Sequence, residues 1–136
     1  MSVKKGLNMD FDIPDQVFAL QTLVVERAHL ANEIGLGSVE VLATPMMIAL
    51  MEAAAVEAVQ EYLPEGWTTV GTSVDVEHLR PSPLGDAVTA KAILVKREGR
   101  KLDFSVSAAD SSGIIGQGNH KRFIVDRGVF MEKLQR

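Results

Sequence analysis

The chain has 136 residues, a length typical of one domain, and its formal net charge at pH 7 is −4. Hydrophobic residues make up 46% and charged residues 24%, a composition far from that of disordered chains. The acidic balance argues against a nucleic-acid-binding protein. The absence of cysteine excludes disulfides and thiolate chemistry and fits a reducing compartment. We therefore expect one domain spanning residues 1–136.

Two features of the chain bear on its location. Residues 1–10 lack the apolar core of a signal peptide. The longest apolar run, residues 45–59, contains two glutamates and is too short to cross a hydrocarbon layer of about 30 Å. We therefore expect a cytoplasmic protein that does not span a membrane.

The first third of the chain predicts little regular structure before one long helix. Residues 4–18 predict at most one short strand, and residues 22–41 predict a mobile connection with one helical turn. Thr44 followed by Pro45 is a helix start, because the threonine hydroxyl can cap the first turn and proline sacrifices no hydrogen bond there. The helix should run from Pro45 to about Tyr62. Apolar residues cover every side of it, as in a helix surrounded by protein.

The remaining sequence alternates between apolar and polar positions, which predicts strands. From Val70 to His78, the even positions are expected to share one face. Further strands are expected at 87–96, 101–109 and 114–125, joined by short turns. Gly116 and Gly118 weaken the last strand and indicate a bulge or a close backbone approach. One apolar helix followed by an antiparallel sheet predicts an α+β fold, with the sheet curled about the helix.

Glu52 is the most informative candidate for chemistry, since it shares a helical face with apolar residues. A buried carboxylate costs several kcal/mol unless it is paired, hydrogen-bonded or protonated. Burial would raise its pKa toward a range useful for catalysis. The alternative, with equal weight, is a glutamate that reaches water at a helix flank or subunit boundary.

His78 and Thr44 are the other catalytic candidates. His78 occupies the inward register near a strand end, and a histidine with a carboxylate makes an acid/base pair near neutral pH, although a lone inward histidine is more often a core residue. The Thr44 hydroxyl lies beside the positive end of the helix and could hold an anionic oxygen, or it could serve only as the N-cap. Eight residues at about 1.5 Å each separate Thr44 from Glu52 by roughly 12 Å. Either the helix begins later, or the site forms across a dimer interface.

Two further residues are candidates for substrate binding. Gly71 could let a ligand approach backbone amides closely, although an ordinary bulge explains it as well. Arg122 shares inward parity with His120 and could meet a phosphate or a carboxylate, the alternative being an exposed strand end. No spacing of His, Asp and Glu indicates a metal site, and there is no Gly-rich phosphate loop or serine-hydrolase elbow. We expect no cofactor.

Taken in order, these residues resemble the fluoroacetyl-CoA thioesterase-like family of hot-dog proteins. The resemblance covers residues 39–125 and implies a homodimer with acyl-CoA sites at its interface. It implies catalytic roles for the threonine, glutamate and histidine, and places Gly71 and Arg122 near the substrate. The segments that carry it are Ala43-Thr44, Leu50-Met51-Glu52, Gly71-Thr72 with His78, Glu98-Gly99-Arg100-Lys101-Leu102 and Ile115-Gly116-Gln117-Gly118.

The function implied by this resemblance is hydrolysis of a small acyl-CoA thioester. The fluoroacetate-specialised enzyme carries phenylalanines before the threonine, whereas residues 35–38 contain none here, which argues against specificity for fluoroacetyl-CoA. A non-catalytic acyl-CoA-binding or sensor module is the alternative, because fold does not fix function. A hydratase ranks last, since the chain lacks an Asp-x-Asn-Pro-x-His-like element.

Overall fold

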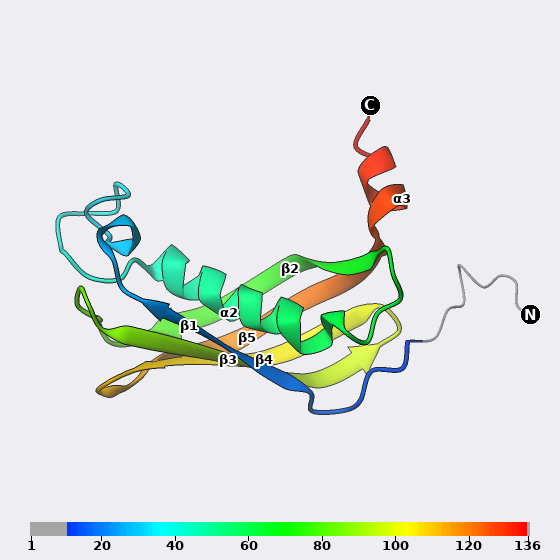
Figure 1. The fold of residues 1–136 in the computed structure, drawn as a ribbon, viewed down its shortest axis with the longest axis horizontal. Coiled ribbons are helices and arrows are strands. Elements are labelled where there is room, and N and C mark those ends of the chain that lie inside the picture. Colours follow the sequence, from blue (N-terminus) through cyan, green and yellow to red (C-terminus); the bar gives the residue numbers. More distant parts are fainter. Residues whose placement is uncertain (1–10, 136) are drawn as a thin grey trace, which may run out of the picture.

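The computed structural model of the protein describes residues 11–135. A five-stranded sheet packs against one long helix, and a short helix follows the last strand (Figure 1). This is the α+β architecture that the sequence pattern predicts. The elements in chain order are β1 (Phe18–Val24), the 3₁₀ helix η1 (Arg27–His29), α2 (Thr44–Gln60), β2 (Trp67–His78), β3 (Ala87–Glu98), β4 (Lys101–Asp110), β5 (Gly113–Asp126) and α3 (Arg127–Glu132).

All neighbouring strands are antiparallel, in the order β1-β3-β4-β5-β2. The turns between β3 and β4 and between β4 and β5 are tight, and Gly99 and Gly113 adopt the positive φ values that such turns require. The first and last strands in this order are β1 and β2. The chain reaches β2 from β1 through α2, so the helix crosses one face of the sheet (Figure 1).

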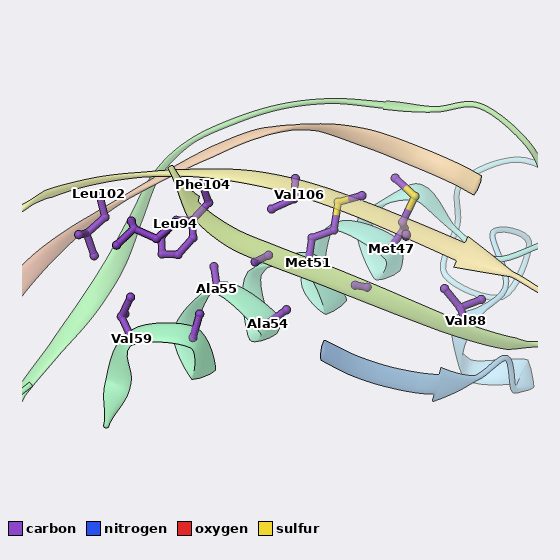
Figure 2. Packing of buried hydrophobic residues seen from close by; sticks show 14 of the residues in the cluster. Met47, Met51, Ala54, Ala55, Val59, Val88, Leu94, Leu102, Phe104 and Val106 are labelled. Carbon is purple, nitrogen blue, oxygen red and sulfur yellow. The ribbon is translucent and has the colours of Figure 1, made fainter. Parts of the chain in front are cut away.

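The core lies between α2 and the inner face of β3, β4 and β5. Along β4, the alternate residues from Leu102 to Ala108 are all buried, as the period of two predicts. Ala54 and Ala55 lie among these side chains, and their small size lets the helix approach the sheet closely (Figure 2). The largest buried residues of this layer are Met47, Met51, Val59, Val88, Leu94, Leu102, Phe104 and Val106.

The first strand does not lie where the sequence predicts it. β1 begins at Phe18, the last residue of the predicted range, and residues 4–10 of that range lie outside the described part of the chain. Phe18, Leu20 and Val24 of β1 point outward and are more than half exposed. The predicted helical turn in the next segment is present as η1.

The long helix begins one residue earlier than predicted. Ala43 is the N-cap and Thr44 is already helical, so the interpretation of Thr44 as an N-cap is wrong. The prediction of a helix covered on all sides is also wrong for a single chain, because Ala49 and Ala53 are exposed. One stripe of apolar helix surface therefore has no cover among residues 11–135.

A bulge between Gly71 and Ser73 changes which alternate residues of β2 point toward the core. Before the bulge the odd positions point inward, since Thr69 is buried and a side chain at Gly71 would point at Glu52. After the bulge the even position Val76 packs against the core. The expectation of one continuous even face from residue 70 to 78 is therefore wrong at its start.

The close backbone approach predicted at the glycines of β5 is confirmed. A Cβ atom on Gly118 would lie 2.2 Å from the backbone oxygen of Asp75, and one on Gly116 would lie 2.5 Å from Met47 Sδ. Only glycine fits at these two places. The second helix, α3, has no counterpart in the sequence predictions, and Asp126 caps it by accepting a hydrogen bond from the Val129 amide.

Candidate active site

Thr44 and His78 meet at one end of the molecule. The Thr44 hydroxyl oxygen lies 2.8 Å from His78 Nδ1, within hydrogen-bonding distance. Thr44 is the first residue of α2 and His78 is the last residue of β2. A hydroxyl and an imidazole in direct contact at a helix start form a pair that can accept a proton and hold a polar substrate atom.

Glycine in the neighbouring strand makes this contact possible. Gly116 of β5 lies opposite His78 in the ladder, and its missing side chain leaves room for Met47, which is almost one turn after Thr44 on α2. The segment before the helix is held by backbone hydrogen bonds from Leu42 to the Ser82 carbonyl and from Ala43 to the His29 carbonyl. These contacts fix the start of α2 against the end of the sheet.

A cleft of about 330 Å³ opens beside the Thr44–His78 pair. The His78 Nε2 atom is buried and has no hydrogen-bond partner among residues 11–135. Burial lowers the pKa of His78, and a backbone contact with Arg80 opposes this only in part, so the imidazole is neutral near pH 7 and able to accept a proton. Apart from Thr44, His78 and Arg80, the cleft lining is aliphatic: Ala31, Leu36, Val41, Leu42, Ala43, Pro45, Leu79 and Pro81.

Glu52 belongs to a second cluster, in the middle of α2. Its Oε2 atom accepts a hydrogen bond of 3.1 Å from Arg122 Nη1. The Glu52 side chain is 38% exposed, so the prediction of a buried carboxylate is wrong for the single chain. The prediction that Arg122 points inward is confirmed, and the alternative of an exposed strand end is excluded because Arg122 is buried. The carboxylate that it meets is that of Glu52, and its contact with substrate stays a prediction.

Besides Glu52, three groups of the protein hold the Arg122 guanidinium. Its Nε donates to the Thr69 hydroxyl at 2.8 Å, and its Nη2 donates to the Thr69 backbone carbonyl at 3.0 Å. Its Nη1 also lies 3.2 Å from His120 Nε2. Burial lowers the pKa of Arg122, while the charge of Glu52 opposes this change. Most donors of this guanidinium are therefore committed to aligning Glu52 within the protein.

Gly71 borders the same cluster. A Cβ atom at this position would lie 2.7 Å from Glu52 Oε2 and 3.2 Å from Arg122 Nη1. Real Cβ atoms do not approach oxygen so closely, so the carboxylate can occupy its position only because residue 71 has no side chain. Gly71 precedes the β2 bulge, as one of the two readings of the sequence expects, while the approach of a ligand to its backbone stays a prediction.

The five predicted site residues thus form two groups within one chain. Thr44 contacts His78, while Glu52, Gly71 and Arg122 lie together near the middle of the helix. Since α2 begins at Thr44, the predicted separation of roughly 12 Å along the helix axis applies, and the idea of a later helix start is excluded.

Sequence reasoning missed the roles of His120 and Thr69. Alternation already placed His120 on the inner face of β5 together with Arg122, but it gave no partner for the imidazole. Thr69 precedes the bulge, where the face of β2 reverses, so simple alternation does not predict its contact with Arg122. Among residues 11–135, no group of three or more His, Asp and Glu side chains could hold a metal ion.

Comparison with known proteins identifies the family. The model of the fluoroacetyl-CoA-specific thioesterase family matches residues 25–128. The chain belongs to this family. A fluoroacetyl-CoA thioesterase from Streptantibioticus cattleyicolor is 41% identical over 96 residues, which cover 71% of this chain and 69% of that protein. Thioester hydrolysis is the chemistry of this family.

Solved structures show the same fold. The structure of the fluoroacetyl-CoA thioesterase FlK matches with a TM-score of 0.85 and 32% identity, covering 91% of this chain and 96% of that one. A hypothetical Thermus thermophilus protein of the thioesterase superfamily matches with a TM-score of 0.85 and 28% identity, covering 92% and 93%. The fold is therefore the hot-dog fold of thioesterases. No helix in the described part of the chain is long and apolar enough to cross a membrane.

Proposed function

We propose that this protein hydrolyses a small acyl-CoA thioester to the free acid and CoA, in the cytoplasm, at a site formed by two copies of the chain. Membership of the thioesterase family supports the reaction. A variant of FlK has been solved in complex with fluoroacetate and CoA, and it matches this chain with a TM-score of 0.81 and 32% identity over 86% of this chain and 98% of that one. The family relationship favours hydrolysis over acyl-CoA binding alone.

The division of the site into two groups supports a homodimer. Gly71, next to Glu52, and His78, next to Thr44, lie on the same strand, β2. β2 is the last strand of the sheet, and its outer edge pairs with no strand among residues 11–135. With the bulge counted as one ladder position, antiparallel pairing of two copies through this edge about a twofold axis at Asp75 would bring His78 of one copy opposite Gly71 of the other.

Such pairing would also cover the exposed stripe of α2. Ala49 and Ala53 are the exposed small residues of this helix, and Glu52 lies beside them with a half-exposed side chain. A second copy lying against this stripe would remove apolar surface from water and would bring Thr44 and His78 within reach of the other copy's Glu52. Each dimer would then contain two equivalent sites.

In the proposed reaction, His78 accepts a proton from a water molecule while the water oxygen attacks the thioester carbonyl carbon. The positive end of the α2 dipole and the Thr44 hydroxyl stabilise the resulting oxyanion. The carbon–sulfur bond then breaks, and the leaving sulfur takes the proton from His78 as CoA thiol. Glu52 of the other copy either orients the water or attacks the carbonyl itself, in which case water releases the acid from the enzyme in a second step.

Gly71 and Arg122 complete the proposed site. Gly71 carries no side chain that would displace the carboxylate, so Glu52 keeps a position beside β2 where the acyl group would reach it. Arg122 holds Glu52 in place from the buried side and borders the substrate. The aliphatic cleft beside Thr44 suits a short uncharged acyl group.

The first test is release of free thiol from a panel of short, branched and aromatic acyl-CoA esters. We expect hydrolysis by the native chain and its loss in His78→Ala and in Glu52→Ala. Hydrolysis that survives in Glu52→Ala would contradict the assignment. Tight CoA-ester binding without turnover by the native chain would favour the binding module instead.

A mixing experiment tests the shared site directly. If His78 of one copy works with Glu52 of the other, a heterodimer of the two inactive variants contains one intact site and one doubly altered site. Random exchange of subunits makes half of the dimers mixed, so about a quarter of native activity should return. No recovery after verified subunit exchange would place the whole site within one chain.

A further inference from the structure

His120 is a buried histidine whose contacts link three elements of the second cluster. Its side chain is 1% exposed and lies on β5, two residues before Arg122. Nδ1 lies 2.8 Å from the backbone carbonyl oxygen of Ser73, directly after the β2 bulge. Nε2 lies 3.2 Å from Arg122 Nη1 and 3.5 Å from Glu52 Oε2. The Phe104 ring stacks on the imidazole with a centroid distance of 6.2 Å.

These contacts determine the protonation of the ring. A backbone carbonyl only accepts hydrogen bonds, so Nδ1 must carry the hydrogen that it donates to Ser73. A guanidinium only donates, so Nε2 must be free of hydrogen in order to accept from Arg122. The ring is therefore the neutral Nδ1–H tautomer. The charged groups that face it are Arg122, which favours this state, and Glu52, which opposes it.

The arrangement matters because Arg122 Nη1 is shared. Thr69 binds the other side of the guanidinium through Nε and Nη2, which sets the plane of the group. Nη1 is left to point between Glu52 and His120. An acceptor on the His120 side holds one of its two hydrogens, so the second is aimed at the carboxylate.

We infer that His120 is a positioning residue that acts as a neutral hydrogen-bond acceptor for Arg122 and thereby aligns Glu52 for thioester hydrolysis. This inference rests on the proposed role of Glu52. A proton on Nε2 would remove the acceptor and place a hydrogen against Arg122 Nη1, so the Glu52–Arg122 pair would have to rearrange. Burial lowers the pKa of His120, which keeps the ring neutral at neutral pH.

Two amide substitutions separate the two bonds of the ring. In His120→Asn, the short amide can still donate to the Ser73 carbonyl but cannot reach the position of Nε2. In His120→Gln, the longer amide can place its oxygen where Nε2 accepts from Arg122, without donating to Ser73. We expect His120→Gln to retain kcat within about fivefold and His120→Asn to lose about tenfold or more, both with little change in KM.

The result that overturns the inference is an Asn variant as active as the Gln variant, because the bond to Ser73 would then be the one that matters. The pH dependence supplies a second readout. Since the Gln side chain does not titrate, the limiting acid slope of log kcat/KM should fall by one relative to the native chain. An unchanged slope also contradicts the inference.

A third measurement does not depend on turnover. Nitrogen-15 spectra of the ring in the native chain at pH 7 should show His120 as the neutral Nδ1–H tautomer. An Nε2–H tautomer or a charged ring overturns the inference even if the protein is an active thioesterase. If the protein proves inactive while this tautomer is found, the proposed function fails and the acceptor geometry of His120 stands.

Discussion

Replacing Gly71 by alanine would place a methyl carbon 2.7 Å from Glu52 Oε2 and 3.2 Å from Arg122 Nη1. To reach an ordinary contact of about 3.4 Å, the carboxylate oxygen must move by about 0.7 Å and the guanidinium nitrogen by about 0.2 Å. The Glu52 side chain is 38% exposed and can make this move without displacing the core. The strain should therefore be relieved at the site and not in the fold.

The expected result is a loss of activity with the fold preserved. A misplacement of about 1 Å can cost a hundredfold in rate, so a shift of about 0.7 Å predicts a fall in kcat of roughly 10-fold to 100-fold. The free energy of unfolding should change by less than about 1 kcal/mol. Thiol release from an acyl-CoA substrate measures the first quantity, and urea unfolding measures the second.

Gly128→Ala is the matched control, since a Cβ atom there meets only Asp126 Oδ1, at an ordinary distance of 3.5 Å. This residue lies in α3, away from both site groups, and alanine should leave kcat unchanged. Native kcat in Gly71→Ala would refute the argument that the position of Glu52 governs the rate. A fall of several kcal/mol in the free energy of unfolding would refute the claim that the Glu52 carboxylate moves aside without disturbing the fold.

Three further predictions concern stability. Burial lowers the pKa of both His78 and His120, so at mildly acidic pH the folded chain binds fewer protons than the unfolded chain. The midpoint of urea unfolding should therefore fall as the pH drops below about 6.5, the pKa of histidine in an unfolded chain. A midpoint that rises would contradict this. Phe104 is 1% exposed, and Phe104→Ala should cost about 3–5 kcal/mol in urea unfolding. Gly118→Ala would place Cβ in steric clash with the Asp75 backbone carbonyl and push β2 away from β5. Thermal unfolding should therefore show a loss in the free energy of unfolding of about 1–3 kcal/mol or more. A loss below about 0.5 kcal/mol, the ordinary range of surface substitutions, would show that the two strands move apart at little cost.

The hairpins were predictable because local chemistry specifies them. Period-two alternation in residues 101–109 and turn residues such as Gly99 and Gly113 act within a few positions of one another. β1 was not predictable in this way. Its outward side carries Phe18 and Leu20 while Ala19 and Gln21 point inward, so its alternation is opposite to that of an amphipathic strand.

The site could be predicted only as a set of residue types. The alternation of β5 correctly predicted that Arg122 points toward the core. Its pairing with Glu52, however, joins residues 70 positions apart and depends on how α2 lies across the sheet. The bond between Thr44 and His78 likewise depends on Gly116, which lets the start of the helix reach the strand end. Such contacts are consequences of packing, which no local pattern contains.

The prediction of a helix covered on every side failed for a reason that bears on assembly. Apolar residues surround α2 in sequence, yet residues 11–135 cover only one side of it and leave Ala49 and Ala53 exposed beside Glu52. A monomer would have little use for small apolar residues there, whereas a second copy approaching this stripe would need them in order to come close. Gly71 of the same cluster lies on β2, whose outer edge pairs with no strand in the described part of the chain. We therefore propose that α2 is a helix of a dimer, in which the same contact would unite the two halves of the proposed site.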